Sequence, residues 1–60
     1  MKNIEINQIV KGRYAGTFVV LGFRIINGEK WAQLKEVNPK DYTETSPGEL
    51  AMPLDAISAI

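Results

Sequence analysis

The stretch FVVLGFRIINGEKWAQLKEV, residues 18–37, decides the fold. Residues 17–26 are dense in β-branched and aromatic side chains, a composition typical of a strand. Asn27-Gly28 follows, and this dipeptide favours a two-residue type I′ turn between antiparallel strands. Residues 29–37 then return as a second strand. The stretch therefore predicts a long β-hairpin.

The two-residue turn fixes which residues of the hairpin share a face, because side chains alternate across a sheet. It pairs Phe23 with Ala32, and the same register continued along the strands pairs Leu21 with Leu34. One face, the predicted core, holds Val19, Leu21, Phe23, Ile25, Ala32 and Leu34. The other face carries Phe18, Val20, Gly22, Arg24, Trp31, Gln33, Lys35 and Val37.

The rest of the chain predicts a small all-β domain that spans residues 1–60. Residues 4–10 suit a first strand, and residues 11–16 form a loop bracketed by glycines that can take positive φ. Residues 38–49 predict a second loop and residues 50–53 a short strand, which Pro53 ends because it has no N–H to donate. A helical turn over 54–57 and a last strand over 58–60 follow. The predicted buried residues of this tail are Leu50, Met52, Leu54, Ile57 and Ile60.

Two stretches resemble the SH3-like small β-barrels. Residues 8–23, QIVKGRYAGTFVVLGF, are similar to the KOW-type pattern of ribosome and transcription proteins, namely a strand, a glycine-containing loop, a glycine and a strongly apolar strand. Residues 52–60, MPLDAISAI, resemble the end of such barrels, where a proline, a short 3₁₀ turn and a closing strand follow an apolar residue. The resemblance implies an all-β, five-stranded SH3-like barrel with a 3₁₀ turn before the last strand.

The composition argues against catalysis. The chain has no histidine and no cysteine, so the usual general base at neutral pH and the strongest nucleophile are missing, as are the usual zinc ligands. Its glycines form no phosphate-binding motif, and Asp41 and Glu44 are interpreted as solvated loop carboxylates. We therefore predict a protein that is not an enzyme and uses no metal or cofactor.

Hydropathy and cysteine content predict the location. No segment approaches 18 consecutive apolar residues, and the first residues lack an apolar run of signal-peptide length. The absence of cysteine fits a reducing compartment. The expected location is the cytoplasm, without a membrane partner.

Charge is uneven along the chain although the net charge is zero. Residues 1–35 carry six basic and two acidic side chains, a balance of +4, and residues 36–60 carry one basic and five acidic side chains, a balance of −4. One interpretation is a well-mixed surface. The other is a bipolar molecule with a basic face.

The candidate binding residues mix cationic and planar side chains away from the predicted core, as in proteins that bind single-stranded nucleic acid. They are Lys11, Arg13, Tyr14, Arg24, Trp31, Gln33 and Lys35.

The first hypothesis is a non-enzymatic module that binds nucleic acid or a nucleoprotein complex. In the alternative, the apolar face around Trp31 docks a protein or a second copy of the chain, as in an adaptor, an inhibitor or a homodimer. Arg24, opposite Trp31, is placed to form a cation–π pair. A third hypothesis, an oligomeric barrel enzyme, requires a symmetric tetramer.

Overall fold

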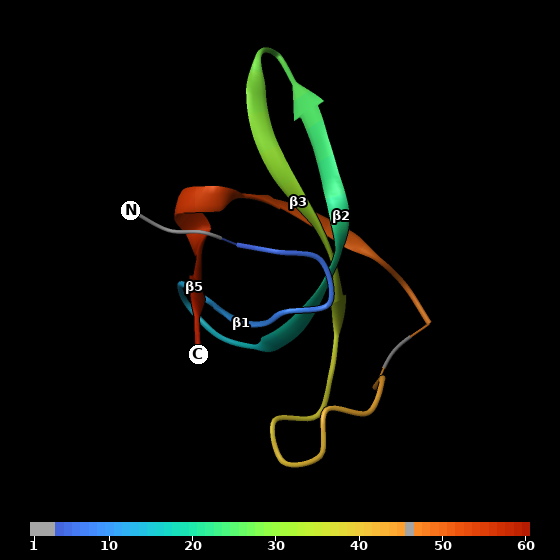
Figure 1. Ribbon diagram of the computed structural model, residues 1–60. Helices are drawn as coiled ribbons and strands as arrows, with labels where there is room; N and C mark the ends of the chain where they lie inside the picture. The colour runs from blue at the N-terminus through green and yellow to red at the C-terminus, as the bar shows by residue number, and fades with distance from the viewer. Residues whose placement is uncertain (1–3, 46) are drawn as a thin grey trace.

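The computed structural model describes residues 4–45 and 47–60. The elements are β1 (Ile9–Gly12), β2 (Thr17–Ile26), β3 (Glu29–Glu36), β4 (Leu50–Pro53), the 3₁₀ turn η1 (Leu54–Ala56) and β5 (Ile57–Ala59) (Figure 1). They form one antiparallel five-stranded sheet in the order β4-β3-β2-β1-β5. This confirms the predicted all-β class and the 3₁₀ turn before the last strand. The two edge strands, β4 and β5, do not pair with each other in this order, so the sheet is not closed. Within the described ranges, no helix has the length and apolar character needed to cross a membrane.

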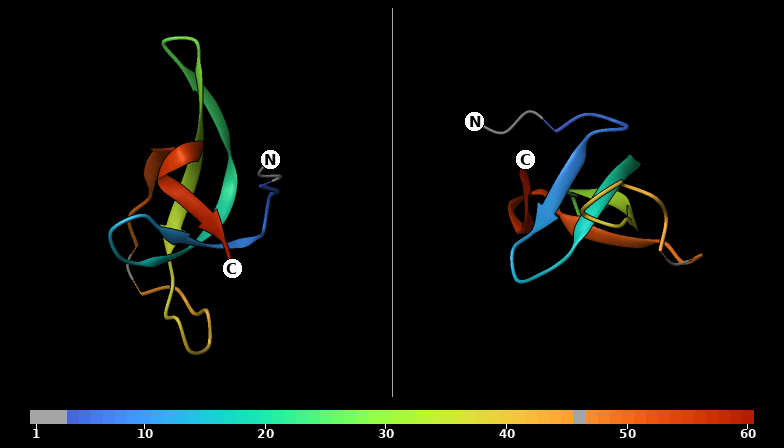
Figure 2. Two further views of the ribbon diagram at one scale, coloured as in Figure 1. Left: turned by 90° about the vertical axis from the view of Figure 1, so that its left-hand side faces the viewer. Right: turned by 90° about the horizontal axis from the view of Figure 1, so that it is seen from below.

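The predicted hairpin is the longest feature of the sheet. Asn27 and Gly28 both have positive φ, 51° and 78°, as a type I′ turn requires. The register at this end is the predicted one, with Phe23 opposite Ala32 and Arg24 opposite Trp31. The end of the hairpin projects beyond the other strands in Figure 1 and in the left view of Figure 2. We call this projecting part, residues 23–30, the arm.

A β-bulge overturns the predicted core face in the first half of β2. The register shifts between Val20 and Gly22, so that Val20 instead of Leu21 lies opposite Leu34. One extra residue in a strand moves every side chain before it to the other face. Phe18 and Val20 are therefore buried, whereas Leu21 is exposed.

The prediction for this half of β2 was wrong, and so was that for Val37. The structure buries Phe18, Val20 and Val37, which were expected on the outer face. Val19 is only half-buried. At the end of the inner face the exposed Ile25 was also wrongly placed in the core.

The core is drawn from both ends of the chain. Its buried members are Val10, Phe18, Val20, Ala32, Leu34 and Ile57, with Ile4, Phe23, Met52 and Leu54 packed partly buried against them. The tail prediction was right for Ile57 and wrong for Leu50 and Ile60, which are exposed. Because β1 and β5 bring Val10 and Ile57 together with the hairpin, the bent sheet surrounds one cluster.

The first strand begins later than predicted. Residues 5–8 form a turn in which the Gln8 amide donates to the Glu5 carbonyl at 3.2 Å and the Glu5 amide donates to Gln8 Oε1 at 2.8 Å. Asn7 takes a positive φ of 71° there. The strand prediction for residues 4–8 was therefore wrong, and β1 starts at Ile9.

Candidate binding surfaces

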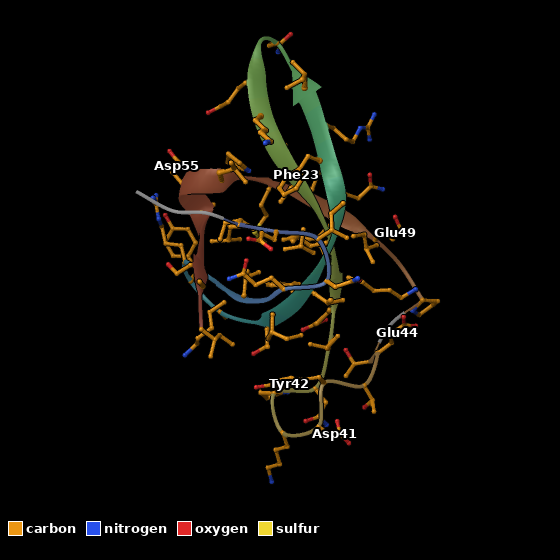
Figure 3. The ribbon with its side chains drawn as sticks, in the orientation of Figure 1. Phe23, Asp41, Tyr42, Glu44, Glu49 and Asp55 are labelled. Atoms are coloured by element: carbon orange, nitrogen blue, oxygen red, sulfur yellow. The ribbon has the colours of Figure 1, made fainter. Side chains whose placement is uncertain are left out.

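The seven predicted binding residues lie on two separate surfaces. The loop surface consists of Lys11, Arg13 and Tyr14, at the end of β1 and in the turn that follows it. The sheet surface consists of Arg24, Trp31, Gln33 and Lys35, on the outer face of β2 and β3. Arg13 bonds to Asp55, whereas Gln33 and Lys35 contact Glu49 and Glu44. Figure 3 shows Asp55 on the opposite side of the view from Glu44 and Glu49.

The loop surface is fixed to the 3₁₀ turn. The Gly12 amide donates to the Gly16 carbonyl at 3.1 Å and closes the loop between β1 and β2. The Arg13 amide donates to the Ala56 carbonyl at 2.8 Å, and Arg13 Nη2 donates to the Asp55 carbonyl at 2.6 Å. A guanidinium has five N–H donors, so the Arg13 side chain is held in place and still has donors to offer.

Tyr14 stands in solvent at the tip of this loop. Its side chain is 92% exposed. Lys11 and Arg13 beside it are also exposed. In the described part of the chain, no carboxylate forms an ion pair with either cation. The loop surface therefore presents an exposed aromatic ring on the same loop as two cations that form no ion pair within the described residues.

The sheet surface is occupied by the protein's own acidic residues. Gln33 Nε2 donates to Glu49 Oε1 at 2.7 Å. Lys35 Nζ lies 3.5 Å from Glu44 Oε1 and 3.4 Å from the Pro47 carbonyl. Trp31 Nε1 donates to Glu29 Oε1 at 3.2 Å. These carboxylates would repel a phosphate, which makes this face a poor platform for nucleic acid.

Trp31 lies on the outer face and is half-buried. The register places it between Arg24 on β2 and Pro53 on β4. The expected cation–π pair with Arg24 is absent from the described residues, where the observed cation–π contact sets Lys30 Nζ 4.5 Å from the centre of the Phe23 ring. Three of the apolar neighbours predicted for Trp31 on this face, Phe18, Val20 and Val37, are buried in the structure instead.

Hydrogen bonds order the first part of the segment after β3, residues 38–43. The Lys40 amide donates to Asn38 Oδ1 at 2.8 Å, and the Tyr42 amide donates to the Asn38 carbonyl at 2.7 Å. The Thr43 amide and hydroxyl both donate to Asp41 Oδ1, at 3.2 and 2.9 Å. These bonds lower the pKa of Asp41 below its ordinary value. The signal for this order was the pair of Asn38 and Asp41, whose side chains bond nearby backbone in turns.

The remaining structural features point to no known family or cofactor. Over residues 4–45 and 47–60, no group of three or more candidate ligands is placed to hold a metal ion, and no pocket opens. No family model matches the sequence, and no curated protein or solved structure matches it either. What the chain does is therefore inferred from the chemistry of its surfaces.

Proposed function

We propose that the chain is a non-enzymatic module that binds single-stranded nucleic acid, free or in a nucleoprotein complex, through its loop surface. The observation that carries this is the Tyr14 side chain, which is 92% exposed on a loop whose two cations, Lys11 and Arg13, pair with no described carboxylate. Aromatic side chains that stack on bases and cations that follow the backbone are the two parts of sequence-tolerant single-strand binding. A cytoplasmic location suits that partner.

The three residues have distinct roles in this proposal. Lys11 and Arg13 contact phosphates, and Tyr14 stacks on a base, an interaction of roughly 1–3 kcal/mol. Because Arg13 is already held by the Asp55 and Ala56 carbonyls, it loses little conformational freedom on binding. Two phosphate contacts give a slope of log affinity against log salt of about −1.4 for a single strand.

The strand arrangement supports the resemblance to SH3-like barrels, and we propose that the bent sheet is an open form of that barrel. Its sheet order, β4-β3-β2-β1-β5, and the 3₁₀ turn before β5 fit such a fold. The loop surface then occupies the glycine-containing loop of the KOW-type pattern, between the first two strands. That position supports the choice of this loop over the sheet surface.

The test is an amide NMR titration of the labelled full chain with eight-nucleotide dT and rU oligomers at low salt. We expect shifts centred on residues 11–14 that weaken as salt is raised. Tyr14→Ala should lower affinity roughly fivefold to a hundredfold, the equivalent of one stack, and Tyr14→Phe should keep it.

Lys40 provides the matched control for Lys11. It is an exposed lysine on another loop, beside Asp41. Lys11→Ala should weaken binding and reduce the salt slope, whereas Lys40→Ala should change neither. The proposal fails if no oligomer shifts the loop amides, or if both lysine variants lose affinity equally.

A further inference from the structure

The arm presents a strand edge with a neighbour on one side only. The pairing of β1 with β2 ends at Ile9 and Val19. Beyond it, the Asn7 amide donates to the Val20 carbonyl at 2.7 Å and the Val20 amide to the Gln8 carbonyl at 3.0 Å. Within the ranges described, no further backbone bond reaches this side of β2. The arm projects away from the other strands in Figure 1 and in the left view of Figure 2.

The register identifies which backbone groups are left over. The residues that flank a two-residue turn, Ile26 and Glu29, exchange hydrogen bonds with each other, and hydrogen-bonded pairs then alternate with non-bonded pairs. Arg24 therefore points its N–H and C=O at β3. The N–H and C=O groups of Phe23 and Ile25 point at the free edge. These two donors and two acceptors have the spacing that an added antiparallel strand requires.

The side chains along this edge have a defined pattern. Ile25 is 69% exposed on the inner face. Phe23, two residues before it on the same face, is half-buried under Lys30. Arg24 lies between them on the outer face, exposed and without an ion pair among the described residues. The edge is thus apolar, cationic and apolar in successive positions.

We propose that this edge binds an extended peptide strand that carries a carboxylate between two apolar residues. The peptide backbone completes the ladder at Phe23 and Ile25. Its apolar side chains cover those two residues on the inner face, and its carboxylate lies opposite Arg24 on the outer face. Strand addition of this kind takes affinity from main-chain bonds and specificity from alternate side chains.

The charge at Arg24 selects this occupant over a second copy of the chain. Two arms paired antiparallel through all four free backbone groups place Phe23 of each opposite Ile25 of the other. The same register places Arg24 directly opposite Arg24 of the second copy, and like charges in that position are destabilising. A peptide strand with a carboxylate opposite Arg24 forms an attractive charge pair at the position where a second copy of the chain would place a repulsive one.

The test is a titration of the labelled full chain with two blocked peptides, TVEVT and TVKVT, followed by amide NMR. We expect TVEVT to shift the Phe23 and Ile25 amides and to bind roughly threefold to tenfold more tightly than TVKVT, as a cross-strand charge pair allows. Arg24→Glu should reverse the preference. It changes an exposed side chain, so the fold should be kept.

A third peptide separates the ladder from simple charge attraction. TVEVT with an N-methyl group on its first valine loses one backbone donor and should bind more weakly than the unmodified peptide. Equal binding of TVEVT and TVKVT, or shifts confined to other residues, would overturn the proposal. So would arm shifts that appear without peptide and grow with protein concentration, because they would identify a second copy as the occupant. None of these results involves the loop surface, so either proposal can fail alone.

Discussion

Gly16 is constrained both by its backbone conformation and by the packing of the core against it. Its φ is 98°, a conformation that side chains of L-residues rarely adopt. A Cβ at this position would lie 2.7 Å from Cζ and 2.9 Å from Cε2 of Phe18. The Phe18 ring is buried and has little room to retreat. The glycine that closes the loop is therefore required both for its φ and for its lack of a side chain.

Gly16→Ala is expected to lower the free energy of unfolding by about 2–4 kcal/mol. About 1–2 kcal/mol comes from the left-handed conformation, and the rest comes from displacing a packed ring. Gly28→Ala is the matched control, because Gly28 also has a positive φ, 78°, and a Cβ there would contact nothing within 4 Å. It should cost only the conformational part. Urea unfolding followed by Trp31 fluorescence measures both, and equal losses would contradict the ring contact.

Among the elements, the hairpin shows how far sequence patterns reach. The turn dipeptide and the alternation predicted the pairing of the arm because both are local properties. The bulge at Leu21 is not local, since it lets Phe18 and Val20 turn toward Val10 and Ile57 from distant strands. A glycine inside a strand often marks a bulge, and Gly22 is the signal in the sequence that could have located this one.

The candidate site was predictable only in part, for a related reason. The sequence identifies cationic and aromatic residues but not which of them meet a carboxylate. Lys35 and Gln33 meet Glu44 and Glu49 because the segment after β3 folds back along the sheet. No hydrogen bond joins Tyr14 to a carboxylate in the described part of the chain, and its loop is instead attached to η1 through Arg13.

The turn around Asp41 should loosen in acid. The bonds from Thr43 lower the pKa of Asp41 below 3.8, so their contribution is fully present above pH 3.8 and is lost as pH falls through the lower, folded-state pKa. We expect the Thr43 amide resonance to titrate with a midpoint below pH 3.8. Asp41→Asn keeps an acceptor oxygen and should abolish the titration. A midpoint at or above 3.8 would show that the bonds do not favour the charged carboxylate.

At the scale of the whole molecule, few of the large side chains that the structure describes are fully buried, so each of them contributes a large share of the stability. A 60-residue chain without cysteine can form no disulfide, and a core of this size contributes only about 3–5 kcal/mol. Ile57 is among the largest of the completely buried side chains, and it comes from β5, an edge strand that pairs with β1. The last strand therefore supplies packing as well as hydrogen bonds, which makes the fold depend on residues at both ends of the chain.

Ile57→Ala should leave the protein largely unfolded at 25 °C. Removing a buried isoleucine side chain costs about 2–5 kcal/mol, which is comparable to the whole stability expected of a chain this size. Ile60→Ala is the matched control, because Ile60 is 67% exposed three residues later and should change stability by less than about 0.5 kcal/mol. Circular dichroism and urea unfolding of both variants make the comparison. Similar losses for the two would mean that β5 contributes through its backbone pairing with β1 and not through Ile57, and the core would then lie within the hairpin and β1 alone.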